Sequence, residues 1–437
     1  MSDARSPPTP DGVPLLGNGL AFSRAPFDAL EEWATLADVV RLSFPGRDLY
    51  VVTEPSLVEA VLVERQDAFT IGRAQRETFA GVEDDAVTAT EGERWRRLRR
   101  ALHPAFTAEG IRAYGDRMAA RTADHVDEWT DGEDLDLLSE HRQLALSVLA
   151  DTLLGTSLDA DDAATVQGAA DALVARSDPR RPGQLLPGWV PTPTERRFER
   201  AVADLDDLVE RVLSGAEPGT EDVRGVLLAA HERGDLSDAE VRDNLTALLL
   251  AGHDSSAVAL TYAWLELSRH EAVRDALVTE VNDVVGDGLP APEHVDDLSR
   301  TRDVVRETLR RYPPAWSVTR EAREAVTLGG YDLPAGAQLM LPQWVLHRDE
   351  RYWDDPATFE PARWRRDVDR PEYAYFPFSG GPRHCVGVRF ARLELVLALA
   401  TMVDRVALDV TTEGPLTFAP ALSLRPEVSV RAVVRRR

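Results

Sequence analysis

The only cysteine of this 437-residue chain lies in the stretch Phe378-Ser379-Gly380-Gly381-Pro382-Arg383-His384-Cys385-Val386-Gly387. A lone cysteine excludes an internal disulfide and a zinc site made of several cysteines. The glycines and the proline before it predict a tight loop, and the apolar residues from Val388 to Leu399 predict a buried helix after it. We therefore expect the sulfur near a helix N-terminus, where backbone N–H groups and the helix dipole favour a thiolate over a thiol.

Three roles fit a lone cysteine in such a loop. It can be a buried structural residue that behaves as a small hydrophobe. It can be a nucleophile with His384 as its base, although adjacent residues in an extended loop usually point in opposite directions. It can bind haem iron as an axial thiolate, with Arg383 placed to pair with a haem propionate. The spacing Phe-x-x-Gly-x-Arg-x-Cys-x-Gly favours the third role. This stretch resembles the haem loop of the cytochrome P450 family, the haem-thiolate monooxygenases.

The resemblance implies haem b (iron protoporphyrin IX) as the cofactor, with Cys385 as the axial iron ligand and Phe378 and Arg383 as cofactor-binding residues. It extends to Trp95 and Arg99, which lie four residues apart and therefore on one face of a predicted helix. This pair is similar to the family's Trp-x-x-x-Arg motif, whose side chains bond a haem propionate. A solvated basic helix face is the alternative. The other arginines of the segment are expected to face outward: Arg94, Arg96, Arg97 and Arg100.

The longest predicted helix runs from Ser237 to His270, with Ser237 and Asp238 as possible N-caps. It is apolar on more than one face, so we expect it to cross the core. In its middle, Asp254 and Ser255 put a carboxylate and a hydroxyl where burial is unfavourable without a function. The segment resembles the family pattern Ala/Gly-Gly-x-Asp/Glu-Thr-Thr/Ser, with Ser255 in place of the usual threonine. The resemblance implies that Asp254 and Ser255 are the catalytic residues, which deliver protons through water; His253 is expected to be structural.

Glu307 and Arg310 lie three residues apart on a predicted helix that ends before two prolines. Alone, such a pair is usually a surface ion pair worth about 0.2–0.5 kcal/mol. The pair is similar to the family's Glu-x-x-Arg motif, and the resemblance implies that Arg363 completes a buried network with it. The segment Ala315–Val318 is expected to be a strand toward the pocket. Arg320, which follows it, matches another propionate ligand of the family.

The rest of the chain predicts a mainly α fold with a smaller β region, and the resemblance implies one cytochrome P450 haem domain over residues 1–437. A flexible, proline-rich N-terminus is expected over residues 1–18. The sequence predicts a β-hairpin over Val39–Val52, a short helix from Pro55 and a loop over residues 71–90. Helices are expected from Ile111 to Gly234, broken at Gly132 and over residues 177–194. By resemblance the second break is a lid over the substrate channel, and a packed surface loop fits it equally well. Strands are expected over residues 326–341 and 407–434.

The composition limits which ligands and which cellular environment suit the protein. Lysine is absent, so all 50 basic residues are arginine, against 75 acidic residues and a net charge of −25. Such a charge excludes general nucleic-acid binding, which needs a basic surface. At about 1 M salt the Debye length falls to about 3 Å and screens the repulsion, so the composition favours a halophilic, archaeal source over a GC-rich mesophile. No signal peptide or membrane span is predicted; we expect a cytoplasmic protein, like the soluble prokaryotic members of the family.

The function implied by the resemblance is monooxygenation of a small organic substrate by O2. Pocket residues such as Leu248, Ala251 and Val318 indicate an apolar ligand. Electrons are expected from a separate donor, by analogy an acidic ferredoxin with its reductase. It is expected to dock on arginines near the cysteine loop, namely those around Trp95 together with Arg365, Arg366, Arg389 and Arg392. Two alternatives stay open: a peroxide-using haem-thiolate enzyme, which the Asp254–Ser255 pair disfavours, and a non-catalytic haem sensor or carrier.

Overall fold

The computed structural model describes residues 5–180 and 192–437, and it confirms the mainly α architecture with a smaller β region. The N-terminal half contains helices α1 (Gly19–Arg24), α2 (Pro26–Ala34), α3 (Pro55–Glu59), α4 (Arg73–Phe79), α5 (Gly92–Leu102), α6 (Ala108–Ala113), α7 (Gly115–Asp127), α8 (Leu137–Thr152), α9 (Ala160–Ser177) and α10 (Pro193–Ser214). The C-terminal half contains α11 (Val223–Glu232), α12 (Asp238–Arg269), α13 (Glu271–Val284), α14 (Ser299–Arg311), α15 (Gln343–Leu346) and α16 (Val388–Arg405).

The strands form three sheets. The largest has the order β1-β2-β8-β5-β3, with β1 (Val39–Phe44), β2 (Arg47–Val52), β3 (Phe69–Ile71), β5 (Val318–Ala322) and β8 (Gln338–Leu341). A second sheet has the order β4-β10-β9, with β4 (Asp134–Asp136), β9 (Val406–Thr412) and β10 (Val430–Arg436). The third pairs β6 (Val326–Leu328) with β7 (Tyr331–Leu333). The hairpin predicted over residues 39–52 is confirmed, with Val39 opposite Val52.

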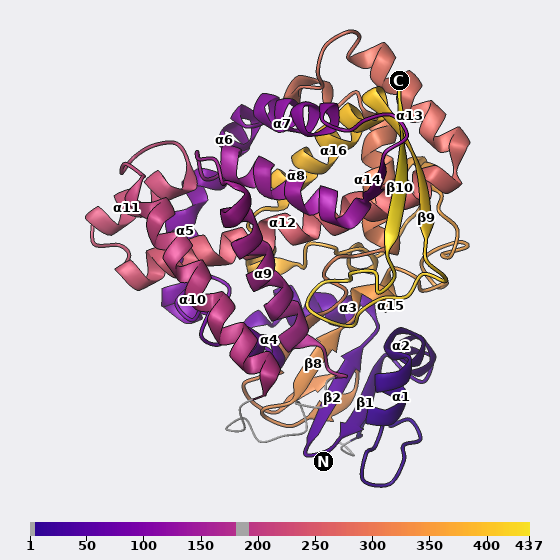
Figure 1. The fold of residues 1–437 in the computed structure, drawn as a ribbon. Coiled ribbons are helices and arrows are strands. Elements are labelled where there is room, and N and C mark those ends of the chain that lie inside the picture. The colour runs from indigo at the N-terminus through magenta and orange to yellow at the C-terminus, as the bar shows by residue number, and fades with distance from the viewer. Residues whose placement is uncertain (1–4, 181–191) are drawn as a thin grey trace.

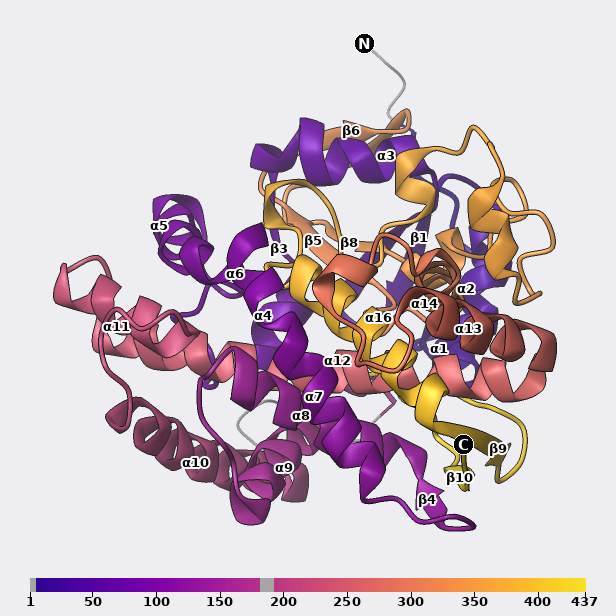
Figure 2. The same ribbon diagram turned by 90° about the horizontal axis from the view of Figure 1, so that it is seen from above.

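Helix α12 runs through the middle of the molecule, with α10 and α11 toward one end and α13 toward the other (Figures 1 and 2). Its start is fixed as predicted: the Ser237 hydroxyl accepts from the Glu240 N–H, and the Glu240 carboxylate accepts from the Ser237 N–H. Helices α8 and α16 pack against it, and its C-terminal half is buried on all sides. A helix of 32 residues that is apolar all round is stable only inside a core.

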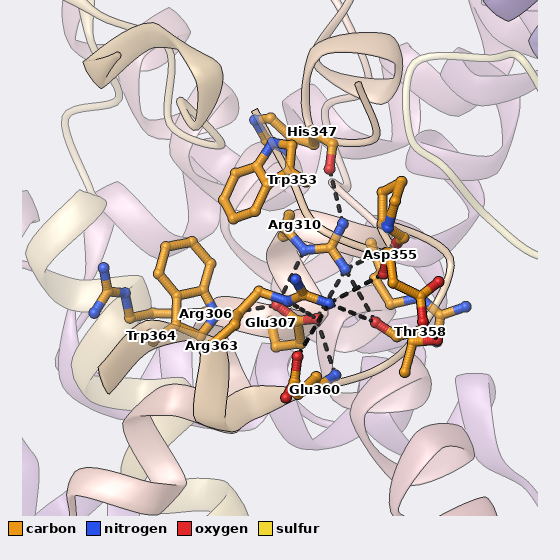
Figure 3. A network of polar contacts seen from close by, with 12 residues as sticks. Arg306, Glu307, Arg310, His347, Trp353, Asp355, Thr358, Glu360, Arg363 and Trp364 are labelled. Atoms are coloured by element: carbon orange, nitrogen blue, oxygen red, sulfur yellow. Dashed lines mark hydrogen bonds and ion pairs between the residues drawn. The ribbon is translucent and has the colours of Figure 1, made fainter. Parts of the chain in front are cut away.

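A buried polar network fixes α14 to the segment that leads toward the cysteine loop (Figure 3). The Arg310 guanidinium donates to both carboxylate oxygens of Glu307, at 2.8 and 3.0 Å, and Arg363 Nε donates to Glu307 Oε1 at 2.9 Å. The side chains of Glu307 and Arg310 are 0% exposed, and that of Arg363 is 2% exposed. Two guanidinium groups share one carboxylate, so one positive charge is left over. The Arg310 guanidinium also donates to backbone carbonyls, including those of His347 and Thr358. The predicted three-residue network is confirmed.

Some local expectations were wrong. Residues 71–90 are not simply a loop, because α4 forms within them, and the short strand β4 was not expected. The strand after the two prolines begins at Val318 rather than Ala315. The N-terminal segment is hydrogen-bonded where it is described: the Pro8 carbonyl accepts from the Arg41 N–H, and Asn18 Oδ1 accepts from the Ser43 N–H. Most of the predicted lid lies outside the described residues. Within the described ranges, no helix is long and apolar enough to cross a membrane.

Candidate haem site

The cysteine loop has the tight geometry that its glycines predict. Gly381 has φ +66°, in the left-handed region, and a Cβ at this position would lie 1.9 Å from the Leu62 carbonyl oxygen. Only glycine fits both constraints. The loop is closed by the Cys385 N–H, which donates to the Phe378 carbonyl at 3.0 Å. Helix α16 then begins at Val388, three residues after the cysteine.

Cys385 faces open space that lies inside the fold. Its side chain is exposed, yet enough protein surrounds it for burial to raise the pKa of the thiol. The Gly387 N–H and the Arg99 guanidinium lower that pKa, but by less than burial raises it. The expected effect of the backbone is present, since the Gly387 N–H lowers the pKa of the thiol, but burial opposes it more strongly. A metal cation at the sulfur reverses this balance, because coordination deprotonates a thiol.

Three arginines near this cysteine are partly or fully buried without an acidic partner. Burial lowers the pKa of Arg99 and Arg383, and it lowers the pKa of Arg320, which is 8% exposed, to about 10. Within the part of the chain that the structure describes, no carboxylate forms an ion pair with any of the three. A buried guanidinium without a counter-charge is costly. These residues therefore fit a group with two carboxylates, such as the propionates of haem.

Trp95 and Arg99 share one face of α5, as predicted, and that face meets the cysteine loop. The Arg383 guanidinium lies 4.7 Å from the centre of the Trp95 ring, and Arg383 Nη2 donates to the Thr90 carbonyl at 2.8 Å. Arg99 Nη2 lies 3.2 Å from His384 Nε2. The structure thus brings together Trp95, Arg99, Arg383 and Cys385, which come from two segments far apart in the sequence.

The other α5 arginines keep exposed side chains, as expected, but two of them also pair with a buried carboxylate. Arg97 donates to both Glu240 carboxylate oxygens, at 2.5 and 2.9 Å, and Arg94 Nε donates to Glu240 Oε1 at 2.8 Å. Glu240 is buried at the start of α12, so these guanidinium groups attach α5 to α12. Arg96 and Arg100 are exposed and contact only Glu93 of their own helix among acidic residues described.

The middle of α12 presents an open face toward the interior. Ala251 and Ser255 are exposed, and Leu248 is half-buried, although most of the helix around them is buried. These positions are spaced by three and four residues, so they form one stripe. Ser256, which points in another direction, donates its hydroxyl to Glu394 of α16 at 2.5 Å. The stripe therefore places the Ser255 hydroxyl among small and apolar side chains that other helices do not cover.

Asp254 does not share that open face. Asp254 is only 7% exposed, and its carboxylate accepts hydrogen bonds from the Arg425 guanidinium at 2.5 and 3.2 Å. The neighbouring His253 is buried, with its Nδ1 2.8 Å from the Leu249 carbonyl oxygen, which agrees with a structural role. Sequence reasoning did not find Arg425, because nothing around it in the sequence distinguishes it from the other arginines. The only signal was general: a buried carboxylate needs a cation somewhere.

Glu394 is a buried carboxyl group that sequence reasoning missed. It lies on α16 in the apolar run after the cysteine loop, and it is 2% exposed. Burial raises its pKa to about 8, and the hydrogen bond from Ser256 opposes that rise only in part. A neutral carboxylic acid at this position stabilises the contact between α12 and α16 without placing a charge in the core.

An accessible thiol with partly or fully buried arginines that lack acidic partners among the described residues fits a haem-thiolate protein. Comparison with known proteins agrees with this class: the chain belongs to the cytochrome P450 family, whose model matches residues 7–430. Cyclooctatin synthase from Streptomyces melanosporofaciens is 32% identical over 407 residues, which are 91% of this chain and 88% of that protein. Cyclooctat-9-en-7-ol 5-monooxygenase from the same organism is 31% identical, over 91% and 88% of the two chains.

Pentalenene oxygenase from Streptomyces avermitilis is 29% identical over 95% of this chain and 92% of its own length. The protein is thus a cytochrome P450 monooxygenase with a haem iron cofactor, and it uses an organic substrate, O2 and a separate electron-transfer partner. These relatives are bacterial, and they give no support to the halophilic archaeal source that the composition predicts.

Proposed function

We propose that this protein inserts one atom of dioxygen into an apolar, terpenoid-like substrate and reduces the other atom to water, with haem b as its cofactor. The observation that carries this proposal is that Ala251 and Ser255 are exposed on α12, an otherwise largely buried helix that packs against α16, the helix that follows Cys385. The names of the relatives support the substrate class, since two of them refer to cyclooctat-9-en-7-ol and pentalenene.

Each site residue has a distinct part in this proposal. Haem, bound through Cys385, supplies the activation of dioxygen. The arginines Arg99, Arg320 and Arg383, with Trp95, hold the propionates, and Phe378 supports the cysteine loop. Ser255 carries a hydroxyl at the open face, with its Oγ donating to the Ala251 carbonyl at 2.9 Å. We assign proton supply to Asp254 and Ser255, because they are the acid and the hydroxyl nearest that face.

Optical titration and turnover test the proposal together. Pentalenene and cyclooctat-9-en-7-ol serve as probes that displace water from the ferric iron of the holoenzyme. Product is then measured with an electron donor plus dioxygen, and separately with hydrogen peroxide alone. We expect product with donor and dioxygen. Product with peroxide alone favours a peroxide-using enzyme, and ligand binding without turnover under either condition favours a haem sensor or carrier.

The Ser255 hydroxyl gives a prediction about coupling. In Ser255→Ala, substrate affinity is expected to stay near that of the wild type, while a severalfold larger share of reducing equivalents is released as hydrogen peroxide, because proton supply slows. Ser255→Thr restores the family residue and is expected to be neutral or mildly favourable. Ser256→Ala is the matched control, since that hydroxyl faces Glu394 instead. Unchanged coupling with lost affinity in Ser255→Ala contradicts the assignment.

The electron donor is proposed to be an acidic ferredoxin, reduced by its own reductase, that docks beside the cysteine loop. This face has a hollow of about 330 Å³ whose lining includes Phe378, His384 and Arg392. Arg389 and Arg392 are exposed at the start of α16, and among the described residues neither has an acidic partner. They are therefore available for short contacts with carboxylates of a donor. Arg365 and Arg366 already pair with Asp303 and Glu360.

Charge reversal at these two arginines tests the docking surface. We expect Arg389→Glu/Arg392→Glu to slow electron transfer from the donor, most strongly at low salt, without altering the optical shift that substrate binding causes. Arg435→Glu carries the same kind of charge change on β10 and serves as the control. Arg97 is a poor probe, because its loss also breaks the contact with Glu240. If electrons are transferred at the wild-type rate across a salt titration, the donor docks on another surface. A salt-rich source remains a prediction from composition, and a cytoplasmic location remains a prediction from the sequence.

A further inference from the structure

The segment between α4 and α5, residues 80–91, carries three acidic residues in a row, Glu83, Asp84 and Asp85. We call it the α4–α5 loop. Glu83 is the buried one of the three, at 2% exposure, whereas Asp84 is exposed. Within the part of the chain that the structure describes, Glu83 Oε1 has no hydrogen-bond partner. Because a buried carboxylate that lacks donors is costly, the fold accommodates Glu83 in its neutral, protonated form.

The middle of the loop is docked on α12 through its backbone. The Asp85 N–H donates to Asp243 Oδ2 at 2.8 Å, and the Val87 N–H donates to Asn244 Oδ1 at 3.0 Å. The side chains of Val82 and Val87 are buried in the main hydrophobic core. Two hydrogen bonds and two apolar side chains therefore hold the loop, and Glu83 lies between them in the sequence.

The docking point lies at one end of the stripe of α12. Asn244 precedes Leu248 by four residues, so the two side chains lie on the same side of the helix. The distance between them along the helix axis is about 6 Å. Ala251 and Ser255 continue the stripe beyond Leu248. The docked loop thus lies at the N-terminal end of the stripe.

The two ends of the loop are fixed by arginines from other parts of the fold. Arg176 of α9 donates from Nη1 to the Ala80 carbonyl at 2.8 Å, and Arg383 donates from Nη2 to the Thr90 carbonyl at 2.8 Å. Loss of the contacts with α12 therefore moves the middle of the loop while its ends stay bound.

The charged groups that act on Glu83 are both acids, Asp243 of α12 and Asp84 of the loop itself. Burial raises the pKa of Glu83 to about 8, and the two carboxylates add to that rise. The nearby Thr88 hydroxyl lowers the pKa, but by less than burial raises it. Ionised Glu83 is therefore both poorly solvated and repelled by its neighbours while the loop is docked.

The cations near this loop are engaged by other carboxylates. Arg94 of α5 pairs with Asp85 at 2.7 Å and with Glu240 at 2.8 Å. Arg242 of α12 lies 3.8 Å from Asp243. Among the residues described, no cation forms an ion pair with Glu83. Ionisation of Glu83 is thus relieved by moving the loop, because solvent supplies what the docked position lacks.

We propose that Glu83 is a pH-sensitive switch: protonated, it leaves the α4–α5 loop docked on α12, and ionised, it drives the loop off Asp243 and Asn244 and uncovers the N-terminal end of the stripe. The movement itself is independent of the substrate. Its effect on access rests on the proposed function, which assigns the stripe to the substrate. The protein is therefore expected to admit apolar ligands faster as the pH rises.

The direction of the pH effect follows from the two protonation equilibria of Glu83. Its pKa is about 8 in the docked loop, against an ordinary value of 4.5, which we expect once the loop is released into solvent. Below the lower value both forms carry the proton, so pH has no effect. Between the two values the released loop binds fewer protons, so the ratio of released to docked loop rises by up to about tenfold per pH unit. Above the higher value the ratio levels off.

Hydrogen exchange of the holoenzyme tests the release of the loop. The reporters are the N–H groups of Asp85 and Val87, because docking supplies their acceptors. Their protection is taken relative to the exchange of an unstructured chain at the same pH. In the wild type it is expected to fall about 10²-fold between about pH 5.5 and 8.5, and in Glu83→Gln it is expected to stay constant. Constant protection in the wild type, or an equal fall in Glu83→Gln, overturns the proposal.

Two further variants test the assignment to Glu83. Glu394→Gln removes another acid whose pKa burial raises to about 8, but on α16, so the loop is expected to keep its wild-type pH dependence; loss of that dependence overturns the assignment. Asp84→Asn changes an exposed residue and keeps an oxygen that accepts from the Gly81 N–H. It removes one carboxylate that repels Glu83, so protection is expected to fall less than in the wild type. A wild-type profile in Asp84→Asn overturns the role of repulsion.

Ligand access is measured by stopped-flow binding of phenylimidazole, an apolar compound that binds haem iron through its nitrogen. We expect the ratio of the binding rates in the wild type and in Glu83→Gln to rise with pH, in step with the loss of loop protection. Because this probe binds the iron itself, the result does not depend on the substrate class proposed above. A ratio that is constant while protection falls overturns the role of the loop in access.

Discussion

Replacing Cys385 with alanine is expected to abolish the strongly red-shifted Soret band of the reduced carbon monoxide complex. That band arises from a thiolate opposite the carbon monoxide, and this chain has no other cysteine that could supply one. Monooxygenase activity is expected to be lost with it, because the thiolate donates the electron density that favours O–O cleavage. The arginines that fit the propionates remain in the variant, so haem content and helical circular dichroism are measured alongside the band.

Two further variants separate the ligand from its neighbours. Cys385→Ser keeps the size of the side chain but replaces the sulfur, and it is expected to lose the band as well. His384→Ala removes the adjacent imidazole, which lies beside Arg99, and it is expected to keep the band. A red-shifted band that survives in Cys385→Ala contradicts Cys385 as the iron ligand. Loss of the band in His384→Ala while haem stays bound contradicts it as well.

The largest effect on stability is expected at Glu307. Glu307→Gln leaves Arg310 and Arg363 buried and facing each other without a carboxylate between them. Removing one partner of a buried ion pair typically lowers the free energy of unfolding by about 3–5 kcal/mol. The whole free energy of unfolding of a folded domain is roughly 5–15 kcal/mol, so this loss is a large share of it. Denaturant unfolding of the holoenzyme, followed by circular dichroism, measures this loss.

The exposed pair Glu93–Arg100 provides the control for this prediction. Both side chains are 72% exposed, although their nitrogen–oxygen distance is 2.7 Å, close to that of the buried pair. Exposed ion pairs contribute about 0–1 kcal/mol, so Glu93→Gln is expected to unfold close to the wild type. Equal effects of the two substitutions contradict the view that burial, rather than ion-pair geometry, makes the Glu307 network important.

The sequence by itself determined the features that depend on residues close together in the chain. The glycines and the proline before Cys385 predict a tight loop, and Gly381 takes the left-handed conformation that such a loop allows. Ser237, one of two candidate N-caps, predicts the start of α12, and in the structure Glu240 completes a capping box with it within one turn. The Glu307–Arg310 pair is equally local, and the family resemblance added Arg363. The family and the mainly α fold follow from such short patterns.

Only the tertiary structure decided which charges meet across long separations. Asp254 and Arg425 are 171 positions apart, and Arg97 and Glu240 are 143 apart. The sequence predicts that a buried carboxylate needs a cation, but with 50 arginines and no lysine it cannot say which one. For the same reason the sequence did not predict that Arg94 and Arg97 pair with Glu240. Helix packing selects these partners, because burial makes one particular pairing far less costly than an unpaired charge.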